Sequence, residues 1–182
     1  MDEAQLKEFI LNEENGLSQS ITVNEQTIQV AYRPVDLLIC NEVKAKEIKD
    51  EKQIRDLKKD YDQNMYFILT LSANNQEIIN QSIGNKEIFE KAVKQLAFGM
   101  NEHVYMVNSE KDTIPPTDYI YPRMYGGSPA TSLLFVFNKD KLQHTDYMDF
   151  CLNEFGFGTG NQKFRFRSKD INNTPQLKFS TN

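Results

Sequence analysis

The stretch Lys163-Phe164-Arg165-Phe166-Arg167-Ser168-Lys169 decides the fold, because aromatic and cationic side chains alternate strictly along it. A β-strand directs successive side chains to opposite faces, so the two phenylalanines share one face and the cations share the other. Phenyl rings favour a core, whereas long cations favour water or an anion. The pattern predicts a strand over 163–168 in which Phe164 and Phe166 are buried and Arg165 and Arg167 are exposed.

The cations Lys163, Arg165 and Arg167 have two interpretations. They can contact an acidic protein partner, phosphates or an anionic glycan. Alternatively, they keep an exposed strand soluble and prevent it from pairing with strands of other chains, which requires no partner. We treat these three residues as candidate partner-binding residues.

Length and composition indicate a globular protein. The chain has 182 residues, of which 39% are hydrophobic and 26% are charged, and this suits a single domain over 1–182. The formal net charge of -5 disfavours a dedicated nucleic-acid binder, which usually carries a basic surplus. No apolar run approaches the roughly 20 residues of a membrane span, so no transmembrane segment is expected.

The order of the predicted elements indicates the α+β class. Helical patterns concentrate in the first half of the chain, with the strongest following Asn85, where Ile88, Phe89 and Ala92 share a face. Candidate strands lie over 21–32 as a hairpin and over 65–71, and then over 103–107, 118–121, 133–137, 147–154, 163–168 and 176–179. Because βαβ alternation is lacking, we expect a mainly antiparallel sheet with the helices packed on one face.

A second candidate binding segment lies between two predicted strands, from Thr117 to Ser128. It places Tyr119, Tyr121, Arg123 and Tyr125 among prolines and glycines. Tyrosine and arginine are enriched in binding hot spots, and loops on a rigid scaffold often carry function. Alternatively, Tyr119 and Tyr121 are two residues apart and share one face of a strand that packs on the core.

The sequence contains little that indicates catalysis. His144 and Asp146 with His103 could form an iron-binding triad, but the usual chain order places the second histidine downstream, where there is none. We predict no metal site, no cofactor and no catalytic residue.

The run Phe155-Gly156-Phe157-Gly158 partly matches an RNA-recognition motif but lacks the flanking residues of that motif, so a hairpin loop is the better interpretation. Cys40 and Cys151 have apolar neighbours and are expected to be buried; a bridge between them is possible but has no support.

Four segments carry a resemblance to a known family: Asn15-Gly16-Leu17, Tyr32-Arg33-Pro34, 65–72 and 121–137. Together they resemble an uncharacterised family of small bacterial cell-envelope lipoproteins. The resemblance implies an envelope location, periplasmic or lipid-anchored, and a non-enzymatic role. The first residues, Met1-Asp2-Glu3, are acidic and begin no apolar signal segment. Two locations stay open: the cell envelope, if a targeting segment has been removed, and otherwise the cytoplasm.

The sequence as a whole favours a non-enzymatic binding or scaffolding module within a larger protein assembly. The partner-binding candidates are the Tyr/Arg segment (Tyr119, Tyr121, Arg123, Tyr125) and the cations Lys163, Arg165 and Arg167. One alternative is an enzyme of unknown class that uses His103 and His144. Another is an envelope carbohydrate-binding module that uses exposed tyrosines.

Overall fold

The structure is a computed structural model that describes residues 1–122 and 128–179. Its α-helices are α1 (Glu3–Leu11), α2 (Val35–Ala45), α3 (Glu51–Tyr61), α4 (Lys86–Lys94) and α5 (Ser168–Asn172). Its strands are β1 (Ser18–Val23), β2 (Gln26–Tyr32), β3 (Asn64–Ala73), β4 (Gln76–Glu77), β5 (Val104–Asn108), β6 (Thr113–Ile114), β7 (Asp118–Ile120), β8 (Thr131–Asn138), β9 (Tyr147–Leu152) and β10 (Gln162–Arg167). Short helical turns are η1 (Glu13–Asn15), η2 (Ile78–Ser82), η3 (Gln95–Gly99), η4 (Met100–Glu102) and η5 (Lys139–Lys141). The α+β class, the antiparallel pairing and the concentration of helices in the first half are confirmed.

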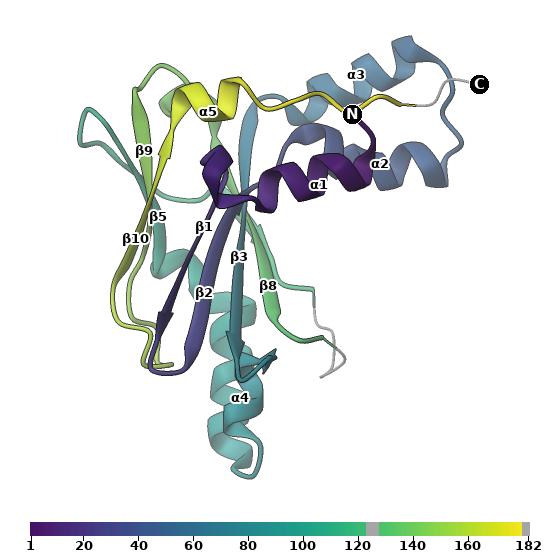
Figure 1. The fold of residues 1–182 in the computed structure, drawn as a ribbon. Helices are drawn as coiled ribbons and strands as arrows, with labels where there is room; N and C mark the ends of the chain where they lie inside the picture. Colours follow the sequence, from purple (N-terminus) through teal and green to yellow (C-terminus); the bar gives the residue numbers. More distant parts are fainter. Residues whose placement is uncertain (123–127, 180–182) are drawn as a thin grey trace.

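The strands form two antiparallel sheets, a division that the sequence did not predict. The first sheet has the order β1-β2-β3-β8-β7, with β4 also paired to β3. The second has the order β10-β9-β5-β6. Figure 1 shows the first sheet in the middle of the molecule and β10, β9 and β5 beside it.

Phenylalanines from both sheets form the centre of the core. The ring of Phe67 in β3 lies 5.2 Å from that of Phe166 in β10 and 6.1 Å from that of Phe150 in β9. Phe135 in β8 lies 5.9 Å from Phe150. The inner faces of the two sheets therefore pack on each other. Phe164 and Phe166 are 4% and 0% exposed, which confirms the prediction from the alternating stretch.

The hairpin between β1 and β2 closes through a tight turn at Asn24 and Glu25. Both residues have positive φ, 50° and 63°, as the two central residues of a type I′ turn require. Asparagine tolerates a positive φ, and Asn24 therefore takes a position where such turns often have glycine. The hairpin expected over 21–32 is confirmed, with β1 and β2 paired from Ser18–Ala31 to Val23–Gln26.

The helices lie mainly at the two ends of the sheets. Helices α1, α2 and α3 form a lobe at one end, and α4 lies at the other (Figure 1). In the lobe, Ile39, Val43 and Ile54 form a small core cluster of their own. On α4, Ala92 is buried but Ile88 is 53% exposed, so the helix buries a narrower face than its sequence predicts.

The segment 176–179 is not a strand, contrary to the sequence prediction. Leu177 is buried and Gln176 and Lys178 are exposed, so the alternation is real. However, the segment runs past α1 toward α3, and helices rather than a neighbouring strand cover its apolar side (Figure 1). Alternation alone does not distinguish these two environments.

Two further predictions concern the cysteines and the membrane. Cys40 and Cys151 are both buried and both free, so the bridge between them does not form. Across residues 1–122 and 128–179, none of the helices combines the length and the apolar character needed to cross a bilayer.

Candidate functional site

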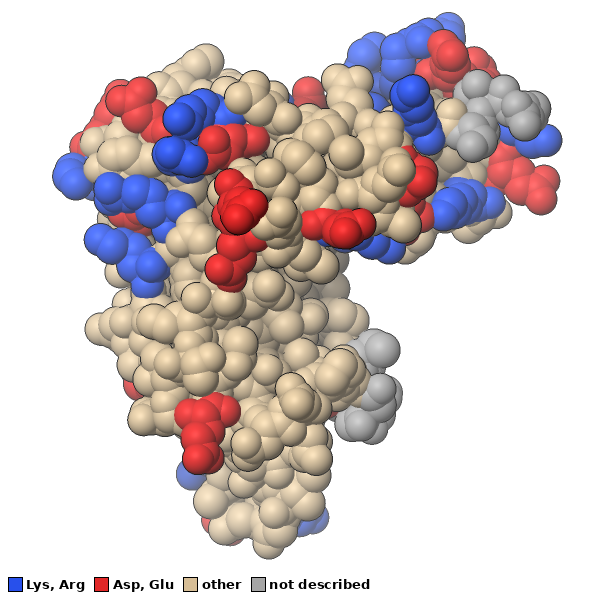
Figure 2. Space-filling view, viewed as in Figure 1, with Lys and Arg blue, Asp and Glu red and all other residues tan. Residues whose placement is uncertain are grey.

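The candidate site is the outer face of the second sheet, which we call the basic face. In the register of β10 and β9, Lys163 lies opposite Cys151, Arg165 opposite Asp149 and Arg167 opposite Tyr147. Residues opposite each other in antiparallel strands share a face. The next strand, β5, adds Tyr105 and Val107, which lie opposite Cys151 and Asp149. Figure 2 shows Lys and Arg gathered over this region, at the upper left of the molecule.

The carboxylate of Asp149 lies beneath the cations of the basic face. Asp149 is only 4% exposed, and it accepts hydrogen bonds from Nε and Nη2 of Arg165 at 2.7 and 2.9 Å. Its Oδ2 also lies 3.8 Å from Nζ of Lys163. The side chains of Lys163 and Arg165 are 61% and 50% exposed. The negative charge is thus covered, while two positive charges face the solvent.

The guanidinium of Arg165 is held on both sides. Its central carbon lies 3.8 Å from the centre of the Tyr147 ring, a favourable cation–π contact. Its hydrogen bonds to Asp149 raise its pKa above the usual value. The Tyr147 hydroxyl accepts a hydrogen bond from Nζ of Lys111 at 3.5 Å, which brings a further cation to the rim. Arg165 is therefore pre-positioned and carries a permanent charge.

Arg167 has a partner at the edge of the basic face. Its Nε donates to Oδ2 of Asp170 in α5 at 2.7 Å, and its side chain remains 56% exposed. Asp170 offsets the charge of Arg167 and Asp149 offsets that of Arg165, while Lys163 and Lys111 add further exposed cations. The side chains of Lys163 and Arg165 are thus exposed cations, the kind of group that donates strong hydrogen bonds to anions.

The structure gives the Tyr119–Tyr121 part of the Tyr/Arg segment a packing role. The Tyr119 ring stacks on Phe135 at 5.3 Å, and its hydroxyl accepts a hydrogen bond from the backbone N–H of Met100. Burial raises the pKa of Tyr119. Tyr121 also packs against the main core. These two residues match the alternative interpretation, a core-packed strand; Arg123 and Tyr125 lie outside the described residues.

The histidines named in the enzyme alternative lie far apart along β5. His103 immediately precedes β5, where its ring is 6.4 Å from that of Phe155. His144 lines a polar hollow of about 470 Å³ with Asn108, at the opposite end of the strand, and with Asp112 and Asp140. Within the part of the chain that the structure describes, no group of three His, Cys, Asp or Glu residues is arranged to hold a metal ion.

The glycine-rich run after β9 is a hairpin loop, as the sequence indicated, and it encloses a carboxylate. The Glu154 side chain accepts hydrogen bonds from the backbone N–H groups of Gly156, Phe157 and Gly158 on one oxygen, at 2.7 to 2.9 Å. The other oxygen accepts one from the backbone of Gly160 at 2.6 Å. Burial alone would raise the pKa of Glu154, but these donors lower it overall. The loop thus binds its own anion and joins β9 to β10.

Sequence reasoning missed Asp149, Tyr147 and Tyr105 as parts of the site. Each is separated from the alternating stretch by at least one connection, and only the strand register brings them onto the same face. A signal was present, because an aspartate inside an otherwise apolar strand requires a partner. That signal does not identify Arg165 as the partner of Asp149.

Comparisons of the chain with protein-family models, with curated proteins and with solved structures give no match.

Proposed function

We propose that the chain is a non-enzymatic binding module that recognises an acidic segment of a protein partner through the basic face. The observation that carries the proposal is the arrangement at Asp149, where one buried carboxylate orients Arg165 and lies near Lys163. Asp149 and the Tyr147 ring hold the Arg165 guanidinium in place before any partner binds. Fixing the side chain before binding reduces the entropy lost when a partner docks.

The net charge of the protein favours a protein partner over a nucleic acid. The basic face is a local patch on a chain of net charge -5. Long polyanions such as nucleic acids extend beyond such a patch and meet the negative charge around it. A short acidic segment of a protein can be matched to the patch alone.

The two alternatives have less support. The enzyme alternative requires His103 and His144 in one cleft, and they lie at opposite ends of β5. The carbohydrate alternative requires tyrosine rings with a solvent-exposed face on which a sugar can stack. On the basic face, the Arg165 guanidinium covers one face of the Tyr147 ring. The resemblance to envelope lipoproteins adds the proposal that the partner lies in the cell envelope, which fractionation of the native host would test.

The test compares two charge-reversal variants with the same change in net charge. The first is Lys163→Glu with Arg167→Glu, on the basic face. The matched control is Lys86→Glu with Lys94→Glu. Both positions are exposed and lie on α4, at the end of the molecule away from the helical lobe (Figure 1). Each variant and the wild type are used to capture proteins from the native host, and the captured proteins are quantified by mass spectrometry.

We expect the basic-face variant to lose at least one acidic protein that the wild type and the α4 control both retain. Direct binding of that protein, once purified, should weaken about tenfold or more for the basic-face variant only, since close charge pairs at interfaces couple by more than about 1.4 kcal/mol. Identical captured sets for both variants would contradict the proposal.

A further inference from the structure

The segment Gln176–Phe179 lies in a groove of the helical lobe. After α5 the chain crosses the molecule and passes between α1 and the α2–α3 pair (Figure 1). Leu177 and Phe179 line hollows on both sides of the segment, one toward α1 and α2 and one toward α3. The segment therefore occupies the groove as a bound peptide would.

Main-chain contacts hold the segment independently of its side chains. The backbone N–H of Leu177 donates to Oδ2 of Asp36 in α2 at 2.7 Å, and that of Lys178 donates to the backbone oxygen of Met1 at 2.9 Å. Asp36 is only 8% exposed, and its other oxygen lies 2.6 Å from Nζ of Lys58 in α3. A buried carboxylate fixed by a lysine thus receives a peptide N–H, which is a way to recognise an extended backbone.

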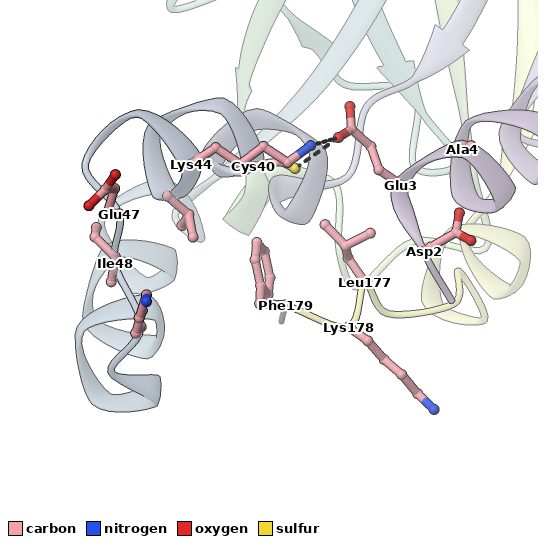
Figure 3. Close-up of a pocket in the computed structure, with 12 residues that line it drawn as sticks. Asp2, Glu3, Ala4, Cys40, Lys44, Glu47, Ile48, Leu177, Lys178 and Phe179 are labelled. Carbon is pink, nitrogen blue, oxygen red and sulfur yellow. Dashed lines mark hydrogen bonds and ion pairs between the residues drawn. The ribbon is translucent and has the colours of Figure 1, made fainter. Parts of the chain in front are cut away.

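Two alternate side chains supply the apolar contacts. Leu177 is 7% exposed and belongs to the main core cluster. Phe179 packs against both the main cluster and the small cluster of the lobe, and Nζ of Lys58 lies 5.2 Å from its ring centre. Figure 3 shows Leu177 and Phe179 directed into the hollow and Lys178 directed away from it. The groove thus accommodates two large apolar side chains two positions apart.

The segment fills the groove only partly. A hollow of about 610 Å³ remains beside it, with Val43, Lys44 and Ile48 from the α2 side and Ala4 from α1 among its lining (Figure 3). A second hollow of about 320 Å³ remains on the α3 side, lined in part by Ile54 and Lys58. A ligand with the same backbone path and bulkier side chains would make contacts that this segment leaves unmade.

We propose that this groove is a peptide-binding site, that Gln176–Phe179 is its exchangeable intramolecular occupant, and that the external ligand is an extended segment of a partner protein with large apolar side chains at alternate positions. The external ligand would follow the same extended backbone path as Gln176–Phe179. It would bind more tightly than this segment because larger side chains would fill the hollows on either side. The intramolecular segment competes because its tether gives it a high effective concentration.

The test uses a fluorescent synthetic peptide with the sequence of residues 174–179 and measures its anisotropy with the full-length chain. The wild type is compared with the variant Leu177→Ala with Phe179→Ala, in which the occupant is weakened. If the occupant is docked about 99% of the time, the peptide should bind the variant about 100-fold more tightly than the wild type. A control peptide with alanine at both apolar positions should bind neither protein.

Hydrogen exchange on the wild type provides a measurement that does not depend on the folding of the variant. We expect the Leu177 amide to exchange at least about 100-fold faster than the Leu69 amide in the central strand β3, because the segment opens without global unfolding. Equal exchange rates at the two amides, or no peptide binding by the folded variant, would overturn the proposal. A concentration-dependent dimer that the peptide dissolves would identify a second copy, rather than a partner, as the source of the ligand and would also overturn it.

Discussion

The Asp149 carboxylate in β9 and the Arg165 guanidinium in β10 form a bidentate ion pair between neighbouring strands, with N–O distances of 2.7 and 2.9 Å. The acid is buried and the base is half exposed. The pair thus holds a buried carboxylate and an exposed cation together on the basic face, which gives Arg165 a structural role.

Replacing Arg165 should destabilise the protein, although the alternation alone indicated a small effect for an exposed side chain. Arg165→Ala leaves the Asp149 carboxylate with only Lys163, whose Nζ is 3.8 Å away, as a cationic partner. Leaving a buried acceptor unsatisfied costs about 1–3 kcal/mol, and urea unfolding would measure it. In the double variant Arg165→Ala with Asp149→Asn, much of this loss should be recovered. A loss for the single variant below about 0.5 kcal/mol would show that the pair is not coupled to folding.

Replacing Phe166 should cause a larger loss for a different reason. Its side chain is fully buried, and its ring lies 5.2 Å from that of Phe67 in the opposite sheet. Phe166→Ala removes this contact and leaves a cavity, which typically costs about 3–5 kcal/mol in the free energy of unfolding. Lys163→Ala, on the opposite face of the same strand, should change it by less than about 0.5 kcal/mol. Similar small effects at both positions would contradict the packing of the two sheets.

Glu154 should make the stability of the protein depend on pH in the acidic range. Its pKa is lowered in the folded state, so its contribution is present above the unfolded value of about 4.5 and is lost as the pH falls through the folded pKa. We expect Glu154→Gln to be less stable than the wild type at about pH 7, and the difference to shrink as the pH falls below about 4. Thermal unfolding at several pH values would measure this. A difference that is independent of pH would show that the loop does not depend on the charge.

Glu3 must be considered in the same experiment. Hydrogen bonds from Lys44 and Lys7 lower its pKa to about 2, so its contribution is also lost in acid. Glu3 is unchanged in Glu154→Gln, and its effect therefore cancels when the variant is compared with the wild type at each pH.

The strand-level features could be predicted from the sequence because they depend on local patterns. The alternation around Phe164 and Phe166 determines which side chains are buried, and this holds in any sheet that covers one face. The pairing of Arg165 with Asp149 could not be predicted in this way. It depends on the register between two strands joined by a nine-residue hairpin loop, and no local pattern determines that register.

The segment Gln176–Phe179 illustrates the same limit. Its alternation resembles that of Phe164–Phe166, yet its apolar side chains pack on helices. Which surface covers an extended segment depends on the rest of the fold. The groove, with Asp36 as its buried acceptor, therefore became apparent only in three dimensions.

The most direct measurement of the proposed function is a map, by NMR, of where an acidic peptide binds. A peptide of ten glutamates would be titrated into the labelled protein at about 100 mM salt, where the Debye length of about 10 Å suppresses long-range attraction. We predict that amide shifts concentrate at 163–167 and 147–151, leave α4 unchanged and disappear in the variant Lys163→Glu with Arg167→Glu. Shifts that avoid the basic face, or a single-stranded oligonucleotide of equal charge that binds there more tightly than the peptide, would contradict the recognition of an acidic protein segment.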